Sequence, residues 1–569
     1  MRHTLLPKSA TALFAAFALA TTSTAQGQIE RVSVSSTGAL ADSTSVGGSI
    51  SADGRFVVFQ SNATNLVAGD TNARPDVFLR DRLFQTTTCI SRAPNGDFGN
   101  GDSNAPVMSD DGRFIAYLSR ASNLDPSDNE NNSLDANFTD VFLYDRNTQT
   151  TTLISRAVSG AQVAGAFDEV SMSDDGSLIV FRGFVDLASG LGAPAQLWGY
   201  RTQTGALERI DDPALSLALV RYASVSGDGR YVAFRAMDLP ASNVRQVYVR
   251  DRVTGTTRLA SILLNGAPGN SDCERPAISD DGRFVAFHTF ATNDFTAAPG
   301  GGLYSRVYLR DLVAGVTRLV SANATGQSNS THCNTAVISP DGRRVAFYSN
   351  QFGFVPADPS PAADALVRDL ATGALLSVAT TSAGTYANGW SFVNDFRADG
   401  AAVLLTSNAA NLSSGDTNNL QDVFVKELTP LIPISYCTAQ SNTLGCTAQL
   451  SASGLASATL PSAFTLQSQN LTNQRPATLF YGFAPNALPF FGGTLCVASP
   501  LFRTPAQSTG GNAGGTDCSG AFSFDFNALI QSGAAPLLTP GTVVYAQASY
   551  SQPSGGRVQS AALAFTILP

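Results

Sequence analysis

The sequence predicts an all-β protein: a seven-bladed β-propeller closed by its own N-terminal strand, followed by a small C-terminal β-sandwich-like domain. Three observations predict it: a phrase repeated seven times, alternation of apolar and polar residues, and a composition change near residue 430. The phrase is a hydrophobic residue, serine or its replacement, any residue, Asp-Gly and a β-rich run. Its glycines stand at positions 54, 112, 176, 229, 282, 342 and 400, so the units are similar in length. A unit of this length must bury its faces against neighbouring units.

Each unit is predicted to fold as antiparallel strands. Asp-Gly between two β-rich runs indicates a hairpin, because glycine adopts positive φ at little cost and aspartate caps the turn. Third strands are expected at residues 76–81, 140–145, 246–251, 306–311, 364–369 and 422–427. The seventh unit has no fourth strand of its own, whereas residues 29–35 match the fourth-strand pattern. We therefore expect residues 29–35 to pair with residues 422–427 and to close the ring.

Residues 1–25 have the pattern of a signal peptide. Arg2, His3 and Lys8 form a positive region, an apolar stretch follows, and Ser23-Thr24-Ala25 resembles a cleavage site. No later segment approaches the roughly 20 apolar residues that a membrane-spanning helix needs. We expect a secreted monomer without a transmembrane segment, located outside the cell or in the periplasm.

Charge is distributed unevenly along the chain. The net charge is −9, but residues 26–436 carry 42 acidic and 30 basic residues, which gives −12. Residues 437–569 carry only two acidic and three basic residues. This change places the propeller at residues 26–430 and the second domain at residues 436–569. The acidic first part and the presence of only two lysines exclude a nucleic-acid partner, which would need a basic surface.

The repeated phrase resembles a known family. Ser-x-Asp-Gly-Arg, then Phe or Tyr, then Val-Ala-Phe is similar to the WD40-like repeat of TolB-type periplasmic propellers, over about residues 29–428. The Trp-Asp dipeptide itself is absent. The resemblance implies a propeller whose relatives are protein-binding platforms, accessory domains of serine peptidases, or lyases that act on acidic sugars. The resemblance therefore narrows the fold more than the function.

The loops between second and third strands carry the most distinctive residues. Two loops contain matching sets of oxygen-bearing side chains: Asp70, Asn72 and Asp76, and Asp416, Asn418 and Asp422. A looser acidic run extends from Asp125 to Asp140. Because units seven, one and two are neighbours in a closed ring, the three loops would form one acidic arc. Alternating carboxylate and amide oxygens would suit Ca²⁺. The alternative is that these residues cap turns leading into the third strand. No other cofactor is expected.

The C-terminal region contains four cysteines, an even number that fits an oxidising compartment. They are Cys437, Cys446, Cys496 and Cys518, which allow three pairings. The pairs Cys437–Cys446 and Cys496–Cys518 are favoured, because each would close a short loop. The region resembles a tail found in large secreted bacterial proteins.

Three cysteines lie in the repeat region. Cys273 and Cys333 each precede their hairpin glycine by nine residues in adjacent units, so they are candidates for a disulfide between blades. The alternative is two free thiols. Cys89 aligns with leucines of other units and is expected in the core.

No set of catalytic residues is found. The sequence has no Gly-x-Ser-x-Gly motif, and only His288 and His332 follow the signal peptide, too few for a histidine cluster around a metal. The pairs Asp110-Asp111, Asp174-Asp175 and Asp280-Asp281 recur at one turn position, so they are interpreted as turn residues.

Three functions remain. The leading hypothesis is a non-enzymatic binding or scaffold protein that presents its loop face to a protein or glycan partner. The second is a carbohydrate-binding or carbohydrate-active protein that uses the acidic arc, with Ca²⁺. The third is a structural component of a surface layer.

Overall fold

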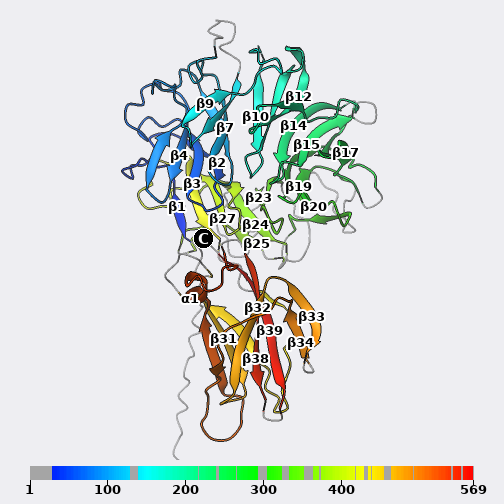
Figure 1. Ribbon diagram of the computed structural model, residues 1–569. Coiled ribbons are helices and arrows are strands. Elements are labelled where there is room, and N and C mark those ends of the chain that lie inside the picture. Colours follow the sequence, from blue (N-terminus) through cyan, green and yellow to red (C-terminus); the bar gives the residue numbers. More distant parts are fainter. Residues whose placement is uncertain are drawn as a thin grey trace, which may run out of the picture.

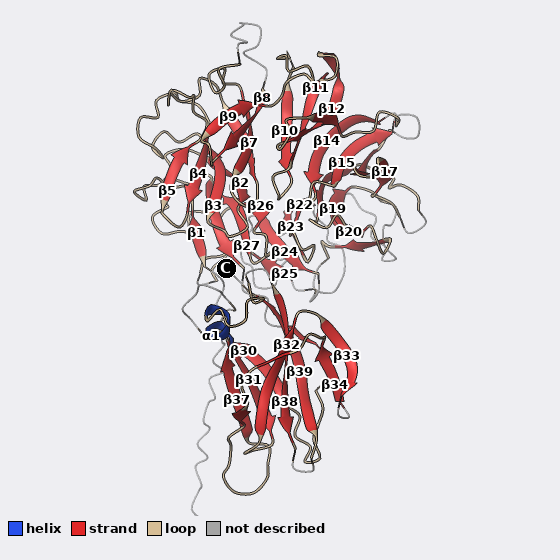
Figure 2. Ribbon diagram, in the orientation of Figure 1, coloured by secondary structure: helices blue, strands red, loops and turns tan. Residues whose placement is uncertain are grey.

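The protein consists almost entirely of β-strands. The computed structural model describes residues 28–567 apart from residues 129–138, 164, 216, 239–242, 264–265, 293–303, 323–331, 351–362, 371–372, 374, 383, 417, 429–433, 437–438, 454–455, 457–462, 491–492, 540–541 and 553–554. The predicted signal peptide therefore lies outside the described residues. Within them, α1 (Phe526–Gln531) is the only α-helix. Figures 1 and 2 show two groups of strands, one above the other.

The described part of the first group contains seven four-stranded antiparallel sheets. In six of them, the order of strands in space follows the order in the chain. The first three sheets contain β2 (Ser45–Ile50), β3 (Phe56–Ser61), β4 (Asp76–Asp81) and β5 (Thr86–Cys89); β6 (Ser103–Met108), β7 (Phe114–Ser119), β8 (Asp140–Asp145) and β9 (Thr150–Leu153); and β10 (Phe167–Met172), β11 (Leu178–Asp186), β12 (Leu191–Arg201) and β13 (Leu207–Arg209).

The remaining four sheets follow the same plan. They contain β14 (Leu217–Val225), β15 (Tyr231–Asp238), β16 (Arg245–Asp251) and β17 (Thr256–Leu259); β18 (Cys273–Ile278), β19 (Phe284–Thr289), β20 (Arg306–Asp311) and β21 (Val316–Leu319); β22 (Cys333–Ile338), β23 (Arg344–Ser349), β24 (Asp364–Asp369) and β25 (Leu375–Ser377); and β26 (Ser391–Phe396), β27 (Ala402–Ser407), β28 (Asp422–Glu427) and β1 (Ile29–Arg31).

The repeated phrase forms the turn between the first two strands of a sheet. Ser51 Oγ donates to Asp53 Oδ1 (2.6 Å), and the same carboxylate oxygen accepts the Arg55 N–H (2.9 Å). Gly54 has φ 70°, which glycine adopts without steric cost. The serine–aspartate bond recurs at 2.6–2.8 Å in the next five units: Ser109–Asp111, Ser173–Asp175, Ser226–Asp228, Ser279–Asp281 and Ser339–Asp341. The prediction that aspartate caps this turn is confirmed.

The hydrophobic core of the first group lies between successive sheets. One cluster joins Val58 and Leu79 of the first sheet to Tyr117 of the second, and another joins Phe59 of the first to Leu404 of the seventh. The first strand of each sheet contacts the sheet before it, and β2 contacts β26 and β27. Four-stranded sheets packed face to face in this way are the arrangement of a β-propeller.

The N-terminal strand belongs to the seventh sheet. β1 pairs antiparallel with β28, with Ile29 opposite Lys426 and Arg31 opposite Phe424, and Figure 1 shows β1 beside the yellow strands of that sheet. The predicted pairing of the N-terminal segment with residues 422–427 is confirmed.

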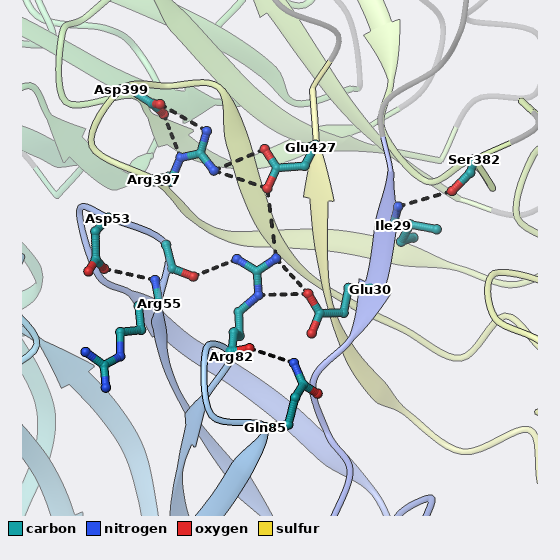
Figure 3. Close-up of polar contacts among 11 residues, drawn as sticks. Ile29, Glu30, Asp53, Arg55, Arg82, Gln85, Ser382, Arg397, Asp399 and Glu427 are labelled. Atoms are coloured by element: carbon teal, nitrogen blue, oxygen red, sulfur yellow. Dashed lines mark hydrogen bonds and ion pairs between the residues drawn. The ribbon is translucent and has the colours of Figure 1, made fainter. Parts of the chain in front are cut away.

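Ion pairs reinforce this join at the end of β28 (Figure 3). Arg82, in the turn after β4, contacts Glu30 of β1 at 2.7 Å and Glu427 of β28 at 3.9 Å. Arg397 contacts the same Glu427 at 3.0 Å and Asp399 at 2.9 Å. The network therefore links the first sheet to both chain segments that meet in the seventh.

A buried arginine makes the second contact at the join. Arg31 Nη2 lies 2.5 Å from Asp416 and Nη1 lies 3.2 Å from Asp422, and all three side chains are almost completely buried. Arg31 thus connects β1 to the loop that leads into β28. Two buried carboxylates share one guanidinium here.

The second group of strands has its own hydrophobic core, formed by residues from Ala448 to Ile567. Its largest sheet has the order β29-β39-β38-β32-β35, with β36 also on β32; a second sheet has the order β30-β31-β37, and β33 pairs with β34. The strands are β29 (Ile434–Tyr436), β30 (Gln449–Ser453), β31 (Thr465–Leu471), β32 (Pro476–Gly482), β33 (Pro485–Phe490), β34 (Gly493–Val497), β35 (Phe502–Arg503), β36 (Gln507–Ser508), β37 (Gly520–Asp525), β38 (Val543–Ser551) and β39 (Arg557–Thr566).

The disulfide pairing expected for this group is wrong. Cys446 bonds Cys518, with Cα atoms 5.4 Å apart and a sequence separation of 72. Asn442 donates to Thr472 and Gly520 pairs with Leu471, so both cysteines lie at the same end of β31. Sheet pairing, not loop length, brings them together. Cys496 is also disulfide-bonded, and Cys437 lies outside the described residues.

Of the two alternatives for Cys273 and Cys333, the structure has the free thiols and not the disulfide between blades, and both cysteines are buried. Each sulfur packs within a different hydrophobic cluster between sheets, with Cys273 near Gln246 and Cys333 near Ser349. Cys89 is buried, as predicted.

We expect Arg31→Ala to lower the free energy of unfolding of the first group by about 3–5 kcal/mol, because it leaves two buried carboxylates without their counterion. Chemical denaturation in the presence of a chelator measures this. Arg74→Ala is the matched control: its ion pair with Asp102 is largely exposed, so a change of less than about 0.5 kcal/mol is expected. Equal effects of the two variants would contradict the role of Arg31.

We expect Cys518→Ser to destabilise the second group by about 4 kcal/mol, because the disulfide closes a long loop in the unfolded chain. Calorimetry with and without reductant measures this. Cys89→Ala removes a free thiol and should leave the effect of reductant unchanged. A Cys518→Ser variant as stable as the wild type would show that the bond contributes nothing.

Candidate functional site

Successive sheets are joined through the turns between their first and second strands. Main-chain N–H groups donate from one turn to the next: Ala52 to Asp110 O (2.8 Å), Asp110 to Asp174 O (2.8 Å), Gly227 to Asp280 O (3.2 Å) and Asp280 to Pro340 O (3.0 Å). Each of these residues directly follows the serine of the repeated phrase. The turns of neighbouring sheets are therefore in direct contact.

Carboxyl side chains gather at these turns. A Cβ atom on Gly227 would lie 2.9 Å from Asp280 Cβ and 3.3 Å from Asp174 Oδ2, so the glycine allows two carboxyl groups to approach from either side. Asp174 Oδ2 is buried and has no hydrogen-bond partner in the described structure. Asp395 of β26 accepts the Ile50 N–H (3.0 Å). We call Asp110, Asp174, Asp280 and Asp395 the carboxyl cluster.

The interpretation of the Asp-Asp pairs as turn residues is therefore only half correct. The second aspartate of each pair, at positions 111, 175 and 281, accepts the serine hydroxyl and caps the turn. The first, at positions 110, 174 and 280, belongs to the carboxyl cluster. Because the pairs recur at one turn position, the sequence indicated that aspartate caps the turn. It did not indicate that the first aspartate of each pair lies among other carboxyl groups.

The carboxyl cluster is electrostatically strained. Burial, together with repulsion from neighbouring carboxylates, raises the pKa of Asp110 to about 7, of Asp395 to about 8 and of Asp280 to about 9. The pKa of Asp174 is raised as well, mainly by burial. Carboxyl groups with a pKa above 7 keep their proton at neutral pH, so the cluster carries less negative charge than four carboxylates would.

Arginine–carboxylate pairs occupy the first two strands of the third, fourth and fifth sheets. Arg182 pairs with Asp168, and Arg221 pairs with Glu169 at 2.7 Å. Arg235 pairs with Glu274 across two sheets, also at 2.7 Å. These charges are compensated locally.

Arg275 differs from these arginines. It is exposed, and among the described residues it forms no ion pair; its guanidinium lies 4.7 Å from the centre of the Tyr222 ring. Arg275 has φ 48° and interrupts the pairing of β18 with β19 between Glu274 and Ala277. This irregularity removes Arg275 from the regular pairing of β18 with β19.

Aromatic side chains continue from Arg275 toward the loops. His288 is 6% exposed, and burial, with the nearby Arg275, lowers its pKa to about 4. The centre of its ring lies 6.4 Å from that of Phe290. The His332 ring lies 5.7 Å from the Phe290 ring and 5.3 Å from the Tyr304 ring, again between ring centres. Phe290 is 40% and Tyr304 36% exposed. We call Tyr222, Arg275, His288, Phe290, His332 and Tyr304 the aromatic row.

The Nδ1 atoms of the two histidines in the row have different surroundings. Nδ1 of His288 is buried and has no hydrogen-bond partner in the described structure. Nδ1 of His332 accepts the Ser305 N–H at 3.1 Å, which leaves any proton of the neutral ring on Nε2. In the sequence, His288 and His332 are two separate histidines that no motif connects. Residues from three sheets make up the row, and no sequence spacing connects them.

The calcium candidates lie where the sequence placed them, in loops before third strands. Asp76 begins β4 and accepts hydrogen bonds from Ser91 Oγ (2.5 Å) and Asn72 Nδ2 (2.9 Å). Asp422 begins β28 and, with Asp416, holds Arg31. No hydrogen bond or ion pair in the described structure joins one triplet to the other. Glu130 and Asp135 of the third loop lie outside the described residues.

No group of three or more His, Cys, Asp or Glu side chains in the described ranges is arranged to hold a metal ion. Among the same residues, no helix is long and apolar enough to span a bilayer.

No protein-family model matches the sequence, and no curated protein matches it significantly. Similar solved structures include TolB from Acinetobacter baumannii, with 16% identity and a TM-score of 0.31 over 52% of this chain and 57% of that one. A putative TolB from Agrobacterium tumefaciens has 13% identity and a TM-score of 0.33, over 60% and 94% of the two chains.

An enzyme is among the similar structures too. Oligogalacturonate lyase from Vibrio parahaemolyticus has 13% identity and a TM-score of 0.42, and the match covers 71% of this chain and 97% of the lyase. The alignment with the Acinetobacter protein spans little more than half of that chain. At these identities and TM-scores, the likeness assigns neither an activity nor a partner to this chain.

We expect the first group of strands to lose stability as pH rises from about 4 to 9. The folded pKa values in the carboxyl cluster exceed the unfolded value, so the folded state binds more protons in this range. Each extra proton lowers the free energy of unfolding by about 1.4 kcal/mol per pH unit. Asp280→Asn should flatten the profile, measured by melting temperature against pH. Asp97→Asn, at an exposed loop position, should not; equal profiles for both would refute the assignment.

Proposed function

We propose that this is an extracytoplasmic, non-enzymatic binding or scaffold protein. Its repeat region would be a seven-bladed propeller closed by the N-terminal strand, with the loops between second and third strands and between sheets as its docking face. A protein or glycan partner would bind this face. No cofactor would be required for binding.

Support for the closed ring comes from the pairing of β1 with β28 and from the contacts of β2 with the seventh sheet. Support for the compartment comes from the Cys446–Cys518 disulfide, because such bonds persist in oxidising environments. The signal-peptide pattern of residues 1–25 agrees with export.

The observation that carries the docking proposal is the aromatic row. It combines an exposed guanidinium that lacks a counterion in the described structure with two exposed aromatic rings. Arginine and aromatic side chains dominate the binding energy of protein interfaces, because they bury large surfaces and pair with specific groups. An acidic or carbonyl-bearing group of the partner would pair with Arg275, and apolar surface would cover Phe290.

The second candidate function is carbohydrate binding or turnover at the acidic arc. The exposed rings of Tyr304 and Phe290 favour carbohydrate binding, because they provide flat apolar surfaces that sugars can cover. It differs from the first proposal in its dependence on the loops at residues 70–76 and 416–422.

The two are separated by binding measurements on variants. Cross-linked capture from envelope extracts, and a glycan array, would identify the ligand of the wild-type protein. Phe290→Ala or Arg275→Ala should weaken capture at least tenfold if the aromatic row is the docking site, because each removes an anchor worth about 1–2 kcal/mol or more.

Phe84→Ala is the matched control, since Phe84 is 67% exposed but lies in a turn on the other end of the first sheet. Capture that depends on Phe84 and not on Phe290 would place the docking surface elsewhere. Binding of glycans alone, with loss in Asp70→Asn, would support the second candidate. Absence of both protein and glycan ligands would contradict the binding function.

A further inference from the structure

Two loops of this protein make equivalent contacts through their described residues and differ in one buried charge. They are residues 69–76, which lead into β4, and residues 415–422, which lead into β28. Gly69 and Gly415 have φ 77° and 79°, and Ala73 and Asn419 both have φ 53°. The two loops therefore share the left-handed conformation at both equivalent positions.

The side chains of the two loops also make equivalent contacts. Asp76 and Asp422 accept the hydroxyls of Ser91 (2.5 Å) and Ser33 (2.6 Å). Asn72 and Asn418 each donate to a main-chain carbonyl of a neighbouring loop, at Gly99 (3.0 Å) and Ala41 (3.2 Å). Their Oδ1 atoms each accept an N–H two residues later, at 3.0 Å.

The loops differ in what lies between their aspartates. In the second loop, the Arg31 guanidinium bridges Asp416 and Asp422. The corresponding residue of the first sheet is Cys89: Arg31 lies opposite Phe424 and Cys89 opposite Phe78, and each phenylalanine is the third residue of its strand. Arg31 and Cys89 also both precede the bonding serine by two residues. A thiol thus replaces the guanidinium.

The first pair of aspartates consequently lacks a counterion. Asp70 is 8% exposed and Asp76 is fully buried, and neither forms an ion pair within the described structure. Asp70 Oδ1 is buried without a hydrogen-bond partner. Arg92, a cation close enough to influence the Asp70 pKa, stacks on Phe98 at 3.8 Å and donates to Gly96 O instead. Buried carboxylates without compensation are costly, and an external cation would relieve that cost.

We propose that Asp70 and Asp76 form a Ca²⁺ site in which the ion takes the place that the Arg31 guanidinium holds in the equivalent loop. The ligands offered are oxygens only, which suits a hard cation. The two carboxylates would be completed by main-chain oxygens and water. The site lies in one of the loops between second and third strands that belong to the proposed docking face, but Ca²⁺ binding there requires no partner and is measured without one.

The test uses the full-length protein after treatment with a chelator. Calorimetric titration with CaCl₂ at constant ionic strength should show one equivalent bound, with a dissociation constant of about 10⁻⁴–10⁻³ M, as in extracellular modules. Asp70→Asn should weaken binding at least tenfold. Asp97→Asn, at an exposed loop position, should bind as the wild type does.

Two exchanges between the loops test the equivalence itself. Cys89→Arg should supply an internal guanidinium, abolish Ca²⁺ binding and raise the melting temperature measured without Ca²⁺. Arg31→Cys should create a second site, so that two equivalents bind. If Cys89→Arg fails to fold, Asp70→Asn decides.

Absence of Ca²⁺ binding by the wild type at about 10 mM, well above the expected range, would overturn the proposal. Full binding by Asp70→Asn would do the same. Binding of Na⁺ or Mg²⁺ with equal affinity would show a site that does not select Ca²⁺, and would overturn the assignment of the ion.

Discussion

The pairing of β1 with β28 is the constraint on which the first group of strands depends. It completes the seventh sheet with a strand from the opposite end of the repeat region, and Arg31 and Glu30 then add buried and half-buried ion pairs to it. Without this strand, the main-chain groups of β28 would form an open edge. The interaction also fixes the position of β1 relative to residues 416–427, because Arg31 has to reach two loop aspartates at once.

Much of this fold could be predicted from the sequence, because its local rules repeat. Ser51, Asp53 and Gly54 form one turn by hydrogen bonds between close neighbours in the chain, and the same bonds recur in later units. Copies of a short-range motif can therefore be recognised from their regular spacing in the sequence. Residues 29–35 could be recognised as a missing fourth strand for the same reason, because the fourth-strand pattern also repeats along the chain.

Less of the candidate site could be predicted from the sequence, because the site depends on contacts between different units. The role of Arg31 could not be derived, because its partners lie at the opposite end of the repeat region and its equivalent in the next unit is a cysteine. The aromatic row draws on the register of three sheets, in which Arg275 is displaced by an irregularity in β18. The pairing of Cys446 with Cys518 follows from the order β30-β31-β37, whereas sequence distance favours shorter loops.

The shared seventh sheet also has a consequence for the order of folding. β1 emerges before the other described strands during synthesis, yet its partner β28 emerges only after the six other sheets of the first group. Until then β1 has no strand to join, and the earlier sheets must form beside an incomplete neighbour. Contacts so distant in sequence close slowly. During synthesis the N-terminal segment therefore stays without its partner strand until β28 has emerged, and chaperones and proteases have access to it in that interval.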